Sequence, residues 1–208
     1  MKIYGKRLFL SKFLTMLILT ICLFSMFGCS NNTTTKLNYQ KALLVVDIQE
    51  DCTGKILKPP FLYQKDSETF ISKLNTIIDE ANSDGVLVIY MTMNSKMEDT
   101  PGAKLDARLK VVNNNVFLKD NLDAFLSSNH KFEKFLMDNK EIKELYIIGL
   151  DATLCVNETA KDAVKKGYKT TILSNAIATI SDKKIDEIIN DYKMNGITVT
   201  TSDQIWKL

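Results

Sequence analysis

The sequence predicts an α/β fold with three layers (α/β/α), in which helices cover both faces of a doubly wound, mainly parallel six-stranded sheet. Short apolar runs alternate with amphipathic helical patterns between residues 41 and 208, as in sheets of this kind. The first run, 42–46, is wholly apolar and is followed by Asp47, which is typical of a central strand buried on both faces. Because no Pro- or Gly-rich break divides the region, we expect one domain over 41–208.

The individual elements follow from periodicity and from residues that begin helices. Apolar side chains at helical spacing fill one face of 67–83, and Asp66 and Ser67 are suited to cap its start. Residues 94–115 are polar and irregular, which predicts a long loop with a short helix near Leu105. The expected strands are 42–48, 86–93, 116–118, 145–148, 170–173 and 197–200, and the other expected helices are 130–139, 155–166 and 182–194.

Residues 1–28 have the composition of a secretory signal, with a basic start, an apolar stretch over 13–27 and a small residue, Gly28, at the end. The next residue is Cys29, so the segment resembles a bacterial lipoprotein signal in which this cysteine becomes the lipidated first residue. Residues 29–40 would then be a polar tether without periodicity. We therefore expect a lipid anchor in the cell membrane, with the domain on the extracytoplasmic face.

An uncleaved membrane anchor is the alternative for this segment. Met26 and Phe27 are bulkier than the residues that usually precede a lipidated cysteine. The apolar run is, however, shorter than the ~20 residues that a spanning helix requires, which favours the lipoprotein. Both interpretations hold the domain at a membrane and facing outward.

The positive net charge of the full chain comes from this signal, which has bases and no acids. The full sequence has 27 Lys and Arg against 25 Asp and Glu, and four of the 27 lie within residues 1–28. Without the signal, 23 bases remain against 25 acids, a net charge of about −2. We therefore expect no nucleic-acid partner, since nothing in the domain predicts a basic surface.

Cysteine and histidine usage limits the chemistry further. Of four cysteines, Cys22 leaves with the signal and Cys29 is the lipid site, so only Cys52 and Cys155 belong to the domain. One such pair is no disulfide scaffold. The single histidine, His130, excludes most zinc clusters and leaves little basis for a Ser-His-Asp or Cys-His site.

Gly149 to Ala160 is the segment most informative about function. It lies between an apolar strand and a helical pattern, so it must make a tight turn that places Cys155 in the first turn of a helix. Free backbone N–H groups and the helix dipole favour negative charge there, which predicts a lowered pKa and a nucleophilic thiolate. The alternative is a small buried cysteine that packs the helix onto the sheet.

Two other polar residues end strands on the same edge of the predicted sheet. Asp47 follows the first strand and Lys119 the third, and ligands of such sheets bind beyond the carboxyl ends of the strands. Asp47 is suited to take the proton of Cys155, and Lys119 to stabilise the resulting charges. Backbone N–H groups of the turn before Cys155 are the natural donors to an oxyanion.

With these motifs the sequence resembles the isochorismatase-like cysteine hydrolase family over nearly all of 41–208. The likeness depends on Ala42 through Asp51, on Lys119 with Asp123-Ala124-Phe125 after it, and on Gly149 through Ala160. The last block is the most specific of the three.

The resemblance implies the roles of several residues. A catalytic Asp-Lys-Cys triad falls on Asp47, Lys119 and Cys155, and a cis non-proline peptide falls on Leu150–Asp151. The backbone N–H groups of Asp151 and Cys155 would form the oxyanion hole. Family members are commonly oligomers, which leaves a homo-oligomer open here.

The sequence departs from the family in three places. Residues 91–96 lack the Asp-x-His metal site of nicotinamidases, so we expect no metal and no cofactor. Ala152 stands where the family often has threonine, and Cys52 where it often has an aromatic residue. Cys52 is thus expected near Cys155, as a pocket wall or as its partner in a reversible disulfide. The other expected substrate-binding residues are Gln49, Tyr63 and Phe125.

The sequence as a whole predicts a membrane-tethered cysteine hydrolase that cleaves a small amide or related C–N bond through a thioester, with a small-molecule substrate. One alternative is an isochorismatase-type vinyl-ether hydrolase. The other is a non-catalytic lipoprotein that binds a small molecule.

Overall fold

A computed structural model describes residues 38–53, 67–93, 104–126 and 130–205. The expectations for the signal, the lipid site at Cys29, the cap at Asp66 and the pocket residue Tyr63 lie outside these residues. The described part from Asn38 onward belongs to one compact unit.

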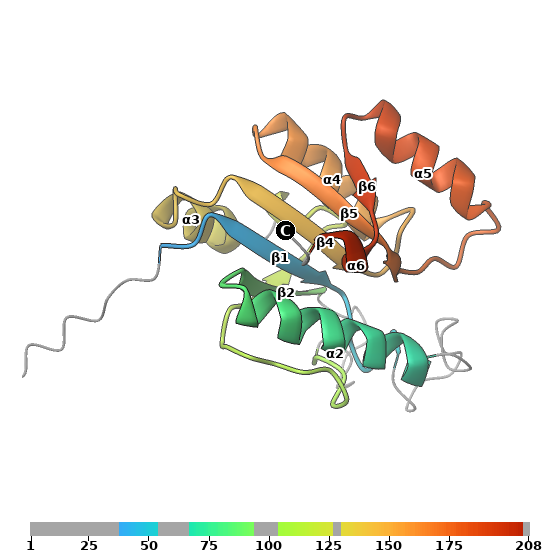
Figure 1. Cartoon of the computed structure of the whole chain (residues 1–208), viewed down its shortest axis with the longest axis horizontal. Coiled ribbons are helices and arrows are strands. Elements are labelled where there is room, and N and C mark those ends of the chain that lie inside the picture. The colour runs from blue at the N-terminus through green and yellow to red at the C-terminus, as the bar shows by residue number, and fades with distance from the viewer. Residues whose placement is uncertain (1–37, 54–66, 94–103, 127–129, 206–208) are drawn as a thin grey trace, which may run out of the picture. The chain divides into compact units, whose positions relative to one another are not determined.

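Six strands form one sheet in which every neighbouring pair is parallel. The strand order is β3-β2-β1-β4-β5-β6, so the chain runs outward from β1 in one direction and then from β4 in the other (Figure 1). This is the doubly wound arrangement that the sequence predicts. The strands are β1 (Lys41–Val46), β2 (Leu87–Met93), β3 (Val116–Lys119), β4 (Glu144–Gly149), β5 (Lys169–Ile177) and β6 (Thr198–Thr200).

Helices lie on both faces of the sheet, and Figure 1 shows α2 on one side and α4 on the other. Residues 42–46 of β1 alternate between the two layers although all five are fully buried, which explains their unbroken apolar run. Leu44 packs in the cluster that includes α3, α4 and α5, whereas Leu43 packs in the cluster that includes α2. The helices are α2 (Ser67–Ser83), α3 (Lys131–Asp138), α4 (Cys155–Lys165), α5 (Ile185–Met194), α6 (Ser202–Ile205) and the 3₁₀ helix η2 (Ala124–Leu126).

Strand β5 is longer than the expected 170–173. It continues to Ile177 after a shift of register between Ile147 and Gly149, which pairs Gly149 with Ile177. The polar residues in the second half of the strand hide this extension from an apolar-run criterion.

Two helical expectations also change. Helix α5 begins at Ile185 rather than at 182, because Lys184 before it is extended. No helix forms at Leu105, which instead makes an isolated antiparallel bridge to Gln49. The short α6 was not expected from the sequence.

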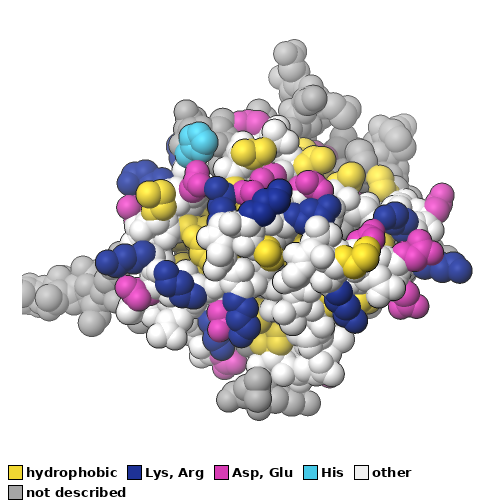
Figure 2. Space-filling view, turned by 90° about the horizontal axis from the view of Figure 1, so that it is seen from above, with side chains coloured by type: hydrophobic (Ala, Val, Ile, Leu, Met, Phe, Trp, Pro, Cys, Tyr) yellow, Lys and Arg dark blue, Asp and Glu magenta, His cyan; other side chains and the backbone are white. Residues whose placement is uncertain are grey.

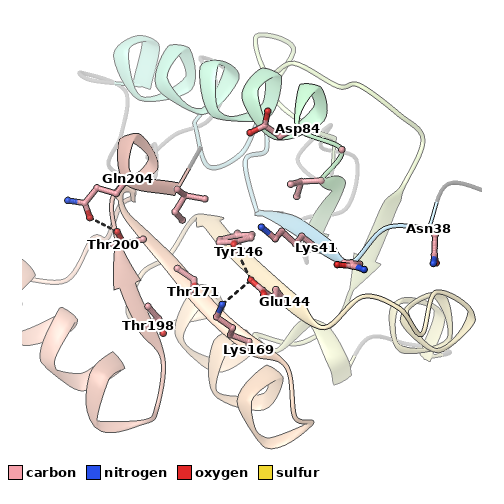
Figure 3. Close-up of a pocket in the computed structure, with 14 residues that line it drawn as sticks. Asn38, Lys41, Asp84, Glu144, Tyr146, Lys169, Thr171, Thr198, Thr200 and Gln204 are labelled. Carbon is pink, nitrogen blue, oxygen red and sulfur yellow. Dashed lines mark hydrogen bonds and ion pairs between the residues drawn. The ribbon is translucent and has the colours of Figure 1, made fainter. Parts of the chain in front are cut away.

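The two edges of the sheet differ. The carboxyl ends of β1 and β4 lie side by side where the strand order reverses, which is the usual ligand-binding position in such sheets. The amino-terminal edge borders a cavity of about 820 Å³ whose lining includes the first residues of three strands, Lys41, Glu144 and Lys169 (Figure 3).

On the face seen in Figure 2, Lys and Arg side chains are interspersed with Asp and Glu side chains. Within the described ranges, which begin at residue 38, no helix is long and apolar enough to cross a membrane.

Candidate active site

Asp47 is the residue directly after β1, at the point of strand reversal. Its φ is +52°, in the left-handed region that a short polar side chain tolerates better than most. Its N–H donates to Met91 O at 3.0 Å, so the turn out of β1 stays tied to β2. The residue is only 4% exposed, which buries a carboxylate at the sheet edge.

Lys119 ends β3 and provides the charge opposite Asp47. Its Nζ lies 2.8 Å from Asp47 Oδ2 and donates to Asn121 O at 3.1 Å, and its side chain is fully buried. A buried ammonium is costly unless it is paired and hydrogen-bonded, so this pair must be formed for the edge to be stable.

Cys155 is the first residue of α4, as the sequence predicts, and is 6% exposed. Gly149 makes the preceding turn possible because β1 and β4 approach closely there. A Cβ at Gly149 would lie 2.1 Å from Val46 O, and its φ is +117°. The Leu150–Asp151 peptide is cis, as the resemblance implies.

The turn before α4 leaves two backbone N–H groups unused. Those of Ala152, Leu154 and Val156 donate to backbone carbonyls, and that of Thr153 donates to the Asp151 carboxylate. Within the described ranges, the N–H groups of Asp151 and Cys155 donate to no residue. These are the two groups that the resemblance assigns to the oxyanion hole, and they flank the thiol.

The thiol and the carboxylate influence each other strongly. Burial raises the pKa of Asp47, although Lys119 and the neighbouring Cys155 thiol act in the opposite direction. Burial, followed by the Asp47 charge, raises the pKa of Cys155 to about 12, and the nearby Lys119 offsets only part of that rise. The two groups therefore titrate as a coupled pair, in which the thiol keeps its proton at neutral pH.

The expected lowering of the Cys155 pKa is therefore wrong. The helix N-terminus and Lys119 do favour the thiolate, but desolvation and the Asp47 charge outweigh them. Cys155 is a protonated thiol at rest, and it needs a base to become a nucleophile.

Asp47 offers a free acceptor for that proton. Its Oδ2 faces Lys119, whereas its Oδ1 is buried and has no fully formed hydrogen bond within the described residues. An unsatisfied buried carboxylate oxygen costs free energy, and such atoms are retained mainly where a catalytic step or a ligand uses them.

Gln49, predicted to bind substrate, connects two strands in the structure. Its Nε2 donates to Met93 O at 3.0 Å, and its Oε1 accepts from Met93 N–H at 2.7 Å. It therefore joins the segment after β1 to the end of β2. Phe125 is 2% exposed and packs in the core against Phe132 and Tyr168, so the core accounts for its position.

Cys52 lies half-buried in the turn after β1, and its Sγ donates to Asp51 Oδ1 at 3.6 Å. Burial is the main cause that raises the pKa of the Cys52 thiol, and the charges of Asp51, Asp47 and Cys155 add to the rise. Cys52 is thus near the candidate site, as expected. Both thiols are free, and a reversible disulfide between them stays a prediction.

Sequence reasoning missed the charged network that shapes the loops around this site. Arg108 donates to both carboxylate oxygens of Asp106, to Thr53 O and to Glu68. Burial acts to raise the pKa of Asp106, but hydrogen bonds from Arg108 and Thr53 outweigh it and hold the pKa below its usual value. No periodicity marks these residues; only their charge within a polar loop could have suggested a role.

No group of three His, Cys, Asp or Glu side chains within the described ranges is arranged to hold a metal ion. His130, the one histidine of the sequence, has a side chain that is 73% exposed and lies 3.3 Å from Glu133.

The parallel α/β sheet of this chain, with a carboxylate, an ammonium and a thiol at its carboxyl edge, is the fold of isochorismatase-like hydrolases. Residues 41–204 match the family model described as the isochorismatase domain. The chain therefore belongs to the isochorismatase family, a family of hydrolases.

Solved structures of this class share the fold. An isochorismatase-like hydrolase from Alkaliphilus metalliredigens is 21% identical, with a TM-score of 0.68 over 81% of this chain and 98% of that one. The N-carbamoylsarcosine amidase of Thermoplasma acidophilum is 22% identical, with a TM-score of 0.65 over 80% of this chain and 98% of that one.

Curated relatives have similar sequence identity, but the match covers a smaller share of their own length. The secreted isochorismatase effector Isc1 of Phytophthora sojae is 23% identical over 171 residues, which is 78% of this chain and 73% of that protein. The isochorismatase family protein 2A of Dictyostelium discoideum is 22% identical over 92 residues, 44% of this chain and 46% of that relative, so the match spans less than half its length.

Proposed function

We propose that this protein is a cysteine hydrolase of small amides, with Asp47 as base, Cys155 as nucleophile and Lys119 as the charge that keeps Asp47 ionised. The observation that supports it most is the unpartnered Asp47 Oδ1 at the same edge as the Cys155 thiol. The likeness in fold to an N-carbamoylsarcosine amidase adds support for amide substrates.

In the first half-reaction, Asp47 removes the thiol proton as sulfur attacks the substrate carbonyl carbon. The carbonyl π electrons move to oxygen, and the N–H groups of Asp151 and Cys155 donate to that oxyanion. The C–N bond then breaks as Asp47 passes its proton to the leaving amine. The product is a thioester on Cys155.

In the second half-reaction, Asp47 removes a proton from water, which attacks the thioester carbonyl. The C–S bond breaks, the carboxylic acid leaves, and Asp47 returns the proton to sulfur. Asp47 thus ends each cycle in the state in which it began, so the site needs no external acid.

The test is amine or ammonia release across a panel of small amides, comparing wild type with Cys155→Ala and Cys155→Ser. We expect both variants to lose at least about 10³-fold in kcat, because removal of a nucleophile abolishes the covalent route. Trapping of an acyl adduct on Cys155, seen by intact-mass spectrometry, would support the thioester directly. Equal release by wild type and Cys155→Ala would contradict the mechanism.

A vinyl-ether hydrolase of the isochorismatase type is the second candidate. A secreted relative is named an isochorismatase effector, so export of this chain is compatible with that activity. An assay with isochorismate separates the two: turnover that survives Cys155→Ala, together with inactivity toward amides, favours this candidate. Saturable binding of such compounds without turnover would instead indicate a non-catalytic binding protein.

We also propose that the protein is anchored by lipid on Cys29 and acts outside the cytoplasm. The support is the sequence of residues 1–29 alone. Metabolic labelling with a palmitate analogue tests it, since Cys29→Ser should lose the label and release the protein from the membrane fraction. Label retained in that variant would contradict the assignment.

A further inference from the structure

The turn that carries the two free N–H groups is held by a side chain that the proposed mechanism does not use. We propose that the carboxylate of Asp151 is a positioning residue, which fixes the oxyanion donors by tying their turn to the segment after β5. This inference depends on the proposed hydrolysis at Cys155 and assigns a new role at that site.

Four hydrogen bonds converge on this carboxylate. Oδ1 accepts from Thr153 N–H at 2.7 Å, from Thr153 Oγ1 at 2.8 Å and from Thr179 Oγ1 at 2.9 Å. Oδ2 accepts from Ile180 N–H at 2.8 Å. One pair of donors belongs to the turn itself and the other pair to residues 179–180, so the carboxylate joins two segments.

The connection is stronger than a neutral contact would be. Hydrogen bonds to an ionised carboxylate are about twice as strong as neutral ones, and all four distances fall within the usual range. Thr179 is itself anchored, because its Oγ1 accepts from Ser181 N–H at 3.0 Å and lies 3.2 Å from Thr153 Oγ1. The turn is therefore attached to a segment with its own internal hydrogen bonds.

The four hydrogen bonds to Asp151 also reduce the effect of its negative charge on the oxyanion hole. A bare carboxylate beside an oxyanion hole would oppose the negative charge that develops there. Because both carboxylate oxygens of Asp151 accept hydrogen bonds, the threonine hydroxyls and backbone N–H groups partly neutralise the negative charge of the carboxylate. The N–H group of the same residue remains available for the substrate oxygen.

The backbone of Ala152, the next residue, makes two further hydrogen bonds, one of them to the same segment after β5. Ala152 N–H donates to Ala178 O at 2.8 Å, and Ala152 O accepts from the Tyr192 hydroxyl of α5. These two bonds do not involve the Asp151 side chain, so they should keep the turn folded when that side chain is removed. Loss of that side chain should let the N–H groups of Asp151 and Cys155 shift without unfolding the domain.

The consequence is a loss of transition-state stabilisation and not of substrate binding. Removal of an oxyanion donor costs about 10²–10³ in kcat, and a misplacement of about 1 Å costs about 10². We expect Asp151→Ala to lower kcat about 10²-fold with KM changed less than about threefold. Asp151→Asn should lower it less, because it keeps one acceptor oxygen and puts an amide group against the Ile180 N–H.

Thr179 provides a matched pair of variants away from the reacting atoms. Thr179→Val removes the hydroxyl and keeps the shape, whereas Thr179→Ser keeps the hydroxyl. We expect about a tenfold loss of kcat in the first and less than about threefold in the second, because one charge-assisted hydrogen bond is lost only in the first. This pair keeps the proposal testable if Asp151→Ala does not fold.

The decisive readout is the inhibition constant of an aldehyde that replaces the best amide substrate. Cys155 adds to the aldehyde carbon, and the oxygen of the adduct occupies the oxyanion position, so this constant reports on the hole itself. Across the variants it should rise in proportion to the fall in kcat/KM, while KM stays constant.

Thermal unfolding of each variant separates a positioning role from a purely structural one. If Thr179→Val and Asp151→Asn lower the melting temperature but retain wild-type kcat and aldehyde affinity, the positioning role is wrong and the hydrolase mechanism stands. If wild type hydrolyses no amide in the panel, the proposed function fails, and the positioning role fails with it.

Discussion

The two edges of this sheet treat charge in opposite ways. At the amino-terminal edge, Lys169 Nζ lies 3.2 Å from Glu144 Oε2, and the two side chains are 66% and 27% exposed. At the carboxyl edge, Lys119 and Asp47 form a closer pair at 2.8 Å, with side chains 0% and 6% exposed. The same pair of chemical groups is thus solvated at one edge and enclosed at the other.

The difference shows that the buried pair at the carboxyl edge is energetically costly, whereas the pair at the amino-terminal edge is not. A solvated ion pair contributes about 0–1 kcal/mol and can be replaced freely. A buried pair does not stabilise a fold better than apolar residues would, yet becomes strongly destabilising when only one member is removed. An enclosed pair with one acceptor oxygen left over is therefore better explained by catalysis than by stability.

The largest effect should come from removing the base. We expect Asp47→Asn to lower kcat about 10²–10⁴-fold, because an amide cannot accept the thiol proton while its shape is nearly that of the acid. Steady-state kinetics on the best amide checks this, and circular dichroism checks the fold. Wild-type turnover in this variant would show that Asp47 is not the base.

Removing one member of each ion pair compares the edges directly. Lys119→Met should cost about 3–5 kcal/mol of unfolding free energy, since it leaves Asp47 buried without a counter-charge. Lys169→Met should cost less than about 1 kcal/mol, because Glu144 is partly exposed and still accepts a hydrogen bond from the Tyr146 hydroxyl. Urea denaturation measures both.

The double variant Asp47→Asn/Lys119→Met provides the control. It should recover much of the stability lost in Lys119→Met, because no unpaired buried charge remains. Equal losses for Lys119→Met and Lys169→Met would mean that the carboxyl edge is wetter than its burial indicates.

A third comparison uses one glycine at each edge, both with positive φ. Gly149→Ala should destabilise the domain by more than about 3 kcal/mol, because its Cβ would lie 2.1 Å from Val46 O. Gly85→Ala, at φ +70°, meets nothing within 4 Å and should cost only about 1 kcal/mol from its backbone conformation. Similar costs at the two positions would show that β1 and β4 can separate.

The pH dependence of kcat/KM should give the smallest effect, and it reports on the protonation of Asp47 and Cys155. In the proposed mechanism Asp47 must be ionised, and its pKa lies above the ordinary 3.8, so the acid limb of kcat/KM should also lie above 3.8. No inflection is expected near 9.0, the ordinary thiol value, because burial and Asp47 raise the pKa of Cys155 to about 12.

The raised pKa of Asp47 also makes the stability of the folded state depend on pH. As pH rises, the unfolded chain loses the proton of this carboxyl before the folded chain does. The contribution of Asp47 to the free energy of unfolding is therefore fully present below about pH 3.8 and is lost as pH rises through the pKa of the folded state.

Thiol alkylation at pH 8, measured in a Cys52→Ser background, should be slower for Cys155 than for a free thiol. Fast alkylation would contradict the protonated resting state.

Much of the fold was predictable because its signals are local. Apolar runs marked all six strands, and strand ends then placed Asp47, Lys119 and Cys155 at one edge. The cis Leu150–Asp151 peptide came from the resemblance alone, since no property of these two residues requires it.

The errors concern quantities that depend on distant neighbours. The Cys155 pKa is set by burial and by a carboxylate more than 100 residues away in sequence, and neither can be read from the sequence of the Gly149–Ala160 segment. The bond between Gln49 and Met93, and the convergence of Thr153 and Thr179 on Asp151, join residues without any periodic relation. Such contacts appear only when the segments are assembled.

A sulfur that keeps its proton until a substrate arrives has a chemical consequence outside catalysis. Peroxide and related oxidants attack the thiolate and not the thiol, so the resting Cys155 is a poor target for conversion to sulfenic acid. In the proposed mechanism the nucleophile becomes reactive only during turnover, so oxidants should inactivate this protein more slowly than an enzyme whose cysteine rests as a thiolate.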